Sequence, residues 1–191
     1  MKKYFAVTTF FAISVLLTSC MDDLEDDTPD VETFFTFNVS GDVTQSFQGP
    51  AGFGTFEDPD TEIDVFLIDL TSDTPSPGSG MRFVGKLDHV PGEQEFDISE
   101  ASLNEENELI FEDLEPEQFI ANYVTNDPEV PHENFIAEEG TLTITDRDEE
   151  YIEGEFNIQA ISLPEEEDDT LAVQIEGEFQ AAETDYEAIE D

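Results

Sequence analysis

The side chains of this protein that could do chemistry are mostly carboxylates. The chain holds 50 Asp and Glu residues against five Lys and Arg, and its formal net charge at pH 7 is −45. Ca²⁺ prefers oxygen ligands, so acidic loops are candidate sites for this ion. The candidate ligands are Asp58, Asp60, Glu62, Asp146 and Asp148. Neither the stretch at 58–62 nor the one at 146–148 has the glycine of an EF-hand loop. The alternative interpretation is that both are runs of solvated charge. No other cofactor is expected.

Other catalytic patterns are weak. His89 and His132 each lie beside a turn that contains proline, and the chain has neither a His-x-His nor a His-Glu-x-x-His motif. Ser79 lies between two glycines, but the Gly-x-Ser-x-Gly spacing of a nucleophile elbow is absent. Pairs of carboxylates suited to glycoside hydrolysis carry no information in so acidic a chain. We therefore predict that the protein is not an enzyme and that both histidines are solvated.

The only cysteine, Cys20, follows a segment with the pattern of a secretory signal. Met1-Lys2-Lys3 is a short basic start, and the run from Tyr4 to Leu17 is apolar except for two Thr and one Ser. This run is shorter than the roughly 20 apolar residues of a membrane-spanning helix, so it predicts a removable signal over residues 1–19. A single cysteine cannot form an intramolecular disulfide, so the mature fold must be stable without one.

The sequence Leu17-Thr18-Ser19-Cys20 resembles the lipobox of bacterial lipoproteins. The resemblance implies that Cys20 is lipidated and becomes the first residue of the mature chain. An ordinary secretory signal with a chance cysteine is the alternative. Residues 20–32 then form an acidic tether, whose acids resemble the export signal of surface lipoproteins in the Bacteroidota. We therefore expect a cell-envelope protein that the lipid on Cys20 holds at the outer membrane, displayed on the surface.

The acidic balance limits the partners. After removal of residues 1–19, only Arg82, Lys86 and Arg147 oppose the acids. Nucleic acid is strongly disfavoured as a partner because phosphate contacts need clustered Lys and Arg, and adsorption to an anionic membrane is disfavoured too. Fourteen of the 17 Phe lie after the cysteine, which argues against disorder. The acids are spread along the chain, which favours adaptation to a salty medium over a binding site for multivalent cations.

Apolar and polar residues alternate from residue 33 onward, and this period of two predicts short β-strands. A hairpin is predicted over 33–47, and strands over 61–70, 81–86, 96–98, 108–111, 118–124, 141–145, 152–160 and 171–179. The pattern also predicts a glycine-rich connection over 49–54 and one helical turn over 102–105. We predict one antiparallel β-sandwich over 33–182, with Greek-key or meander connections, and a disordered acidic tail over 183–191. A β-barrel is the alternative.

The segment Ile-Glu-Gly-Glu-Phe occurs twice, at 152–156 and at 175–179. We interpret the two copies as neighbouring strands of a meander, each with a glycine that permits a bend or a bulge. An internal duplication is the alternative.

Several stretches resemble small β-rich lipoproteins of the Bacteroidota: FTFNVSGDV, FIANY, GTLTIT, IEGEFNIQA and VQIEGEFQA. That group has no established activity, so the resemblance implies a fold and a compartment rather than a chemistry. We expect a lipid-anchored, non-enzymatic structural or binding protein. A Ca²⁺-dependent adhesion module and a barrel that holds a small apolar ligand are the alternative functions.

Overall fold

The computed structural model describes residues 33–57, 62–72, 76–100, 114–130, 134–148, 150–163 and 170–184. In these residues the fold is all-β, as the sequence predicts, and no helix is present. The strands are β1 (Phe34–Gly41), β2 (Gln45–Gly49), β3 (Ala51–Glu57), β4 (Asp64–Thr71), β5 (Gly80–Gly85), β6 (Gln94–Ile98), β7 (Phe119–Val124), β8 (Asn134–Arg147), β9 (Tyr151–Ser162) and β10 (Ala172–Glu183). The helical turn predicted over 102–105 and the strand predicted over 108–111 lie outside the described residues.

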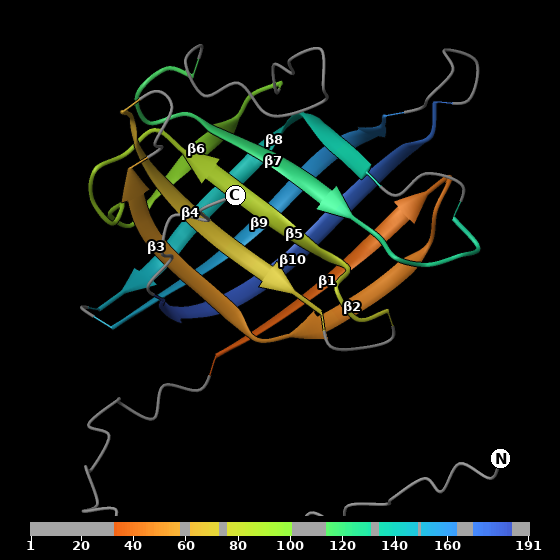
Figure 1. Cartoon of the computed structure of the whole chain (residues 1–191), viewed down its shortest axis with the longest axis horizontal. Coiled ribbons are helices and arrows are strands. Elements are labelled where there is room, and N and C mark those ends of the chain that lie inside the picture. The colour runs from red at the N-terminus through yellow and green to blue at the C-terminus, as the bar shows by residue number, and fades with distance from the viewer. Residues whose placement is uncertain are drawn as a thin grey trace, which may run out of the picture.

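The strands belong to one sheet whose hydrogen bonding closes on itself. The pairings run β10–β3–β4–β5–β7–β8–β9 and back to β10, with β1 and β2 added beside β10 and β6 beside β8. Most pairs are antiparallel, but β10 with β3 and β6 with β7 make short parallel contacts. Figure 1 shows two layers, with β3, β4, β5 and β7 in front and β1, β10, β9 and β8 crossing behind them. The two layers are therefore parts of one continuous sheet.

The first hairpin forms where the sequence predicts it. β1 and β2 pair antiparallel, with Phe37 opposite Phe47. Gly41 turns the chain with a φ of 114°, and a Cβ there would lie only 2.7 Å from the carbonyl oxygen of Ala172. Glycine has no Cβ and adopts positive φ at little cost, so this residue suits the turn.

The space between the layers is filled by apolar side chains. The largest fully buried ones are Tyr123, Phe35, Phe37, Phe53, Phe66, Phe83, Phe119, Phe135, Phe179, Ile68, Leu70 and Met81. Ring centroids of neighbouring aromatic residues lie 4.9 to 6.5 Å apart. Such pairs add about 0.5–1.5 kcal/mol each beyond the area that they bury. The stability of the fold therefore comes from this aromatic core rather than from charge pairs.

β4 is buried on both faces, as its apolar sequence predicts. Its residues in the core between the layers are Phe66, Ile68 and Leu70. Val65 points to the opposite face and joins a second buried cluster, which consists of Val65, Val84, Leu114 and Ile120.

Two strands differ from the prediction. The sequence predicts a connection over 49–54, but Ala51–Glu57 form β3 and pair with β4 along their whole length. Ala51 and Phe53 are buried, so packing overrides the low strand propensity of Gly52 and Gly54. β8 begins at Asn134, well before the predicted start at Thr141, and its register against β9 shifts twice. Such bulges interrupt the alternation of apolar and polar residues that identifies a strand in a sequence.

A partly buried polar network joins β2 to the residues that follow β7. The Tyr123 hydroxyl donates a hydrogen bond of 2.6 Å to Oε1 of Gln45, whose amide donates to the Asp127 carboxylate. Thr125 also donates to Oε1 of Gln45, at 3.3 Å. Burial raises the pKa of Tyr123 to about 12, because the phenolate would lose its hydration. Tyr123 is thus a core residue with a satisfied hydroxyl.

Candidate functional site

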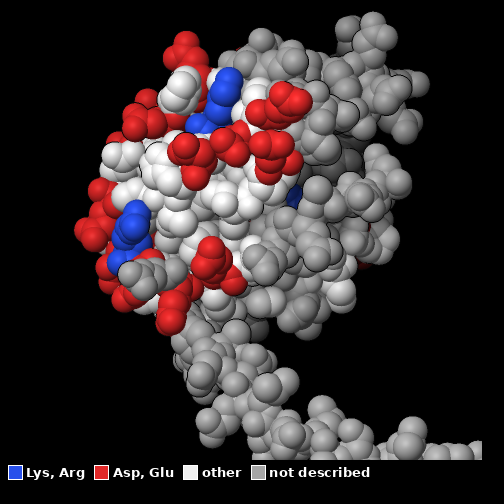
Figure 2. Space-filling view, turned by 60° about the vertical axis from the view of Figure 1, so that its left-hand side comes forward, with Lys and Arg blue, Asp and Glu red and all other residues white. Residues whose placement is uncertain are grey.

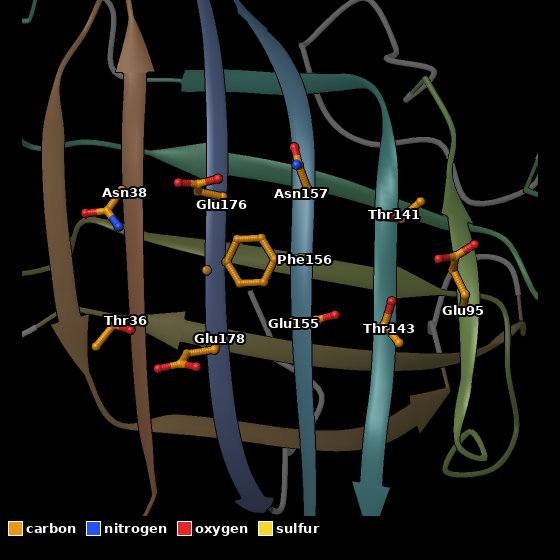
Figure 3. Close-up of a pocket in the computed structure, with 11 residues that line it drawn as sticks. Thr36, Asn38, Glu95, Thr141, Thr143, Glu155, Phe156, Asn157, Glu176 and Glu178 are labelled. Carbon is orange, nitrogen blue, oxygen red and sulfur yellow. The ribbon is translucent and has the colours of Figure 1, made fainter.

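The outer face of the rear layer carries a hollow that crosses five strands, β1, β10, β9, β8 and β6, and has a volume of about 500 Å³. The residues that line it are Thr36, Asn38, Glu95, Thr141, Thr143, Glu155, Phe156, Asn157, Glu176, Gly177 and Glu178, and we call this surface the polar groove (Figure 3). Neighbouring strands lie about 4.8 Å apart, so the polar groove is roughly 19 Å long.

Strand register arranges the polar side chains of the groove in two rows. The first row consists of Thr36, Glu178, Glu155, Thr143 and Glu95, in strand order. The second row consists of Asn38, Glu176, Asn157 and Thr141. Residues two apart on a strand point to the same face, so both rows lie on the outside of the sheet. Figure 3 shows these side chains spread over the strands rather than converging on one point.

No positively charged side chain in the described part of the chain pairs with the carboxylates of the polar groove. Glu155 lies directly opposite Glu178, and like charges in this position destabilise a sheet. Among the described residues, no ion pair or side-chain hydrogen bond involves these two carboxylates or those of Glu95 and Glu176. The groove therefore presents four free acceptor groups of the same charge.

The two asparagines of the second row are oriented by neighbouring side chains. Ser46 donates a hydrogen bond of 2.7 Å to Oδ1 of Asn38, and Gln174 donates one of 3.3 Å to Oδ1 of Asn157. Because both asparagines accept through Oδ1, their Nδ2 donors are left for solvent or a ligand.

The basic side chains in the described residues are used elsewhere. Arg82 lies 3.5 Å from Asp69 across β4 and β5, and Arg147 donates hydrogen bonds to the carbonyl oxygens of residues 90 and 91. Lys86 lines a second hollow, of about 490 Å³. None of the three lines the polar groove. The side of the domain in Figure 2 likewise shows many acidic side chains and few, separated basic ones.

The repeated Ile-Glu-Gly-Glu-Phe segments form the middle of the polar groove and supply five of its lining residues. They pair antiparallel in β9 and β10, so Gly154 faces Phe179 and Gly177 faces Phe156. A Cβ at Gly177 would lie 2.7 Å from Cζ of Phe156, and one at Gly154 would lie 2.6 Å from Cζ of Phe179. Each phenylalanine therefore covers the glycine of the other copy. The interpretation of the two copies as neighbouring strands is confirmed. Of the bends or bulges predicted at the two glycines, β8 has a bulge opposite Gly154, but the β9–β10 register has no shift at Gly177.

Of the predicted calcium ligands, Glu62, Asp146 and Asp148 lie in the described residues, and they are not grouped as a metal site there. Glu62 lines the second hollow, whereas Asp146 is the residue before last of β8 and Asp148 follows that strand in the turn to β9. Within the ranges that the structure describes, no group of three or more His, Cys, Asp or Glu is arranged to hold a metal ion. Asp58 and Asp60 lie outside the described residues.

The remaining side chains that could take part in catalysis, His89 and Ser79, form hydrogen bonds to neighbouring residues. His89 is exposed, with Nδ1 2.7 Å from Oδ1 of Asp88, and this hydrogen bond lowers the pKa of Asp88. Ser79 is buried, and its hydroxyl accepts a hydrogen bond of 2.9 Å from the backbone N–H of Asn126. His132 lies outside the described residues.

The sequence alone does not reveal the polar groove, because its residues come from five strands and only the register brings them together. The one signal in the sequence is local. Thr141 and Thr143 place uncharged side chains on the solvent face of a strand, in a chain where that face is otherwise rich in acids.

No protein-family model matches this chain, and neither the curated proteins nor the solved structures include a match. The described residues form no helix of sufficient length and hydrophobicity to cross a membrane.

Proposed function

We propose that this protein is a lipid-anchored, non-enzymatic binding or structural protein of the cell envelope, held at the outer membrane through Cys20. The observation that carries the proposal is the position of the only cysteine, directly after a signal-like segment. Each buried CH₂ of an acyl chain contributes about 0.8 kcal/mol, so several chains on one cysteine form a stable anchor.

The position and charge of the folded domain support this proposal. β1 begins at Phe34, so the chain that links it to Cys20 spans at most about 50 Å. An anionic leaflet repels a domain with so many acids, so attachment must come from the lipid. The acids lie on many strands rather than at one site, which supports adaptation to a salty medium as the reason for the composition.

The anchor is tested by labelling cells that express the full chain with a radioactive fatty acid. The expected result is a labelled protein in the membrane fraction whose mature N-terminus is Cys20 by mass spectrometry. Cys20→Ser should abolish the label and release the protein from the membrane fraction. An unlabelled wild-type chain, or a mature N-terminus at another residue, would refute the proposal.

A further inference from the structure

We propose that the polar groove binds an extended, lysine-rich segment of a partner protein. The inference deepens the binding role proposed above and rests on it. It starts from the unpaired carboxylates of Glu155 and Glu178, which face each other across β9 and β10. Their repulsion is not relieved by Arg82, Lys86 or Arg147, none of which lines the groove. A cationic partner would supply the missing charge.

The spacing of the carboxylates favours several separate positive charges over a single ion. Glu178 and Glu155 lie on neighbouring strands, about 4.8 Å apart, and Glu95 lies two strands beyond Glu155, about 10 Å away. In the described residues, neither these acids nor Glu176 belong to a group of three or more side chains that could hold a metal ion. Lysine side chains along a peptide carry their charges at comparable intervals, since residues two apart in an extended chain are about 6.6 Å apart.

The shape of the groove favours a peptide over a small amine. Its length of roughly 19 Å accommodates about six residues of extended chain. The polar side chains that line the groove offer a small ligand little apolar surface to bury, whereas a longer segment adds contacts strand by strand. Asn38 and Asn157 provide amide donors for the peptide carbonyl groups between the lysines. A second copy of this chain does not fit, because its own acids would repel the groove.

The test is the binding of fluorescently labelled hexalysine to the full-length chain, measured by fluorescence anisotropy at low ionic strength. Glu155→Gln with Glu178→Gln removes two charges from the groove. Glu57→Gln with Asp64→Asn removes two charges from another exposed pair that faces across β3 and β4, outside the groove. Both double variants relieve a like-charge pair, so neither is expected to lose stability.

The groove variant should weaken hexalysine binding about fivefold, the effect of losing two exposed ion pairs, and the control variant less than twofold. Equal weakening in the two variants would show diffuse attraction to the whole acidic surface and would overturn the proposal. Absent hexalysine binding, or a groove that binds spermine more tightly than hexalysine, would overturn it too. Labelling at Cys20 is independent of these outcomes, so the anchor proposal stands or fails separately.

Discussion

The close contact between the two Ile-Glu-Gly-Glu-Phe segments predicts a large effect of a very small change, Gly177→Ala. The new Cβ would lie 2.5 Å from Cβ of Phe37, 2.5 Å from the carbonyl oxygen of Thr36 and 2.7 Å from Cζ of Phe156. The first two atoms belong to β1, which is paired with β10 along this stretch, so they cannot rotate away. Only the Phe156 ring could move, and it packs against Phe83 with centroids 4.9 Å apart.

The expected loss of unfolding free energy follows from two opposing effects. Forcing an extra methyl group into a packed core costs about 1–3 kcal/mol. Replacing glycine by alanine lowers the entropy of the unfolded chain, which offsets about 0.4–1 kcal/mol of that cost. With the midpoints of these two ranges, the net loss for Gly177→Ala is about 1.3 kcal/mol. For a domain of this size such a loss lowers Tm by roughly 2–8 °C.

The assay is urea unfolding followed by circular dichroism, with Gly92→Ala as the matched control. A Cβ at Gly92 would meet no atom within 4 Å, so this variant keeps only the entropic effect and should gain about 0.4–1 kcal/mol. Adding Phe156→Leu to Gly177→Ala should not restore wild-type stability, because the contact with the Thr36 carbonyl remains. A Gly177→Ala protein as stable as the wild type would refute the packing argument.

Two further predictions concern pH and salt. The folded-state pKa of Tyr123 is raised to about 12, above its unfolded value of about 10, so its contribution to stability is complete below pH 10 and is lost as the pH rises to 12. Chemical unfolding should show a fall of about 2 kcal/mol over this range, and a fall of the same size in Tyr123→Phe would contradict the assignment. The Tm of the protein should rise as the NaCl concentration increases from 0.1 to 1 M. The screening length shrinks from about 10 to about 3 Å over this range, which weakens the repulsion between surface carboxylates. Ca²⁺ at matched ionic strength should add little, and a saturable Ca²⁺-induced rise in Tm at high salt would instead favour the Ca²⁺-dependent module.

Apart from β4, whose continuous apolar run identifies it, the strands that the sequence predicts well are those where one residue in two is buried. In the β1–β2 hairpin, Phe37 and Phe47 face each other in the core, and the alternation is uninterrupted. The same holds for β9 and β10, where eleven register positions follow one another without a shift. In such strands the period of two reflects a real difference between an inner and an outer face, so the pattern identifies the strand.

The parts that the sequence misses depend on partners far away in the chain. β3 contains two glycines, and its strand conformation comes from pairing with β4 on one side and with the end of β10 on the other. The polar groove is missed for a related reason, since only the strand register brings Glu155, Glu178 and Glu95 into one row. A single sequence records which residues alternate, but the pairing of strands fixes which side chains meet.

The outer face of this protein can be so acidic because its inner face is so apolar. Charges on the surface repel one another at low salt, whereas the buried rings contribute in any medium. Glu155 opposite Glu178 does not contribute to stability, yet the two copies of the repeat place these residues at the centre of the β9–β10 pair, each flanked by a glycine and a phenylalanine of the core. The core thus holds the two carboxylates in fixed register despite their repulsion. A pair held in this way is suited to meet positive charge brought by a partner, and the hexalysine experiment measures whether it does so.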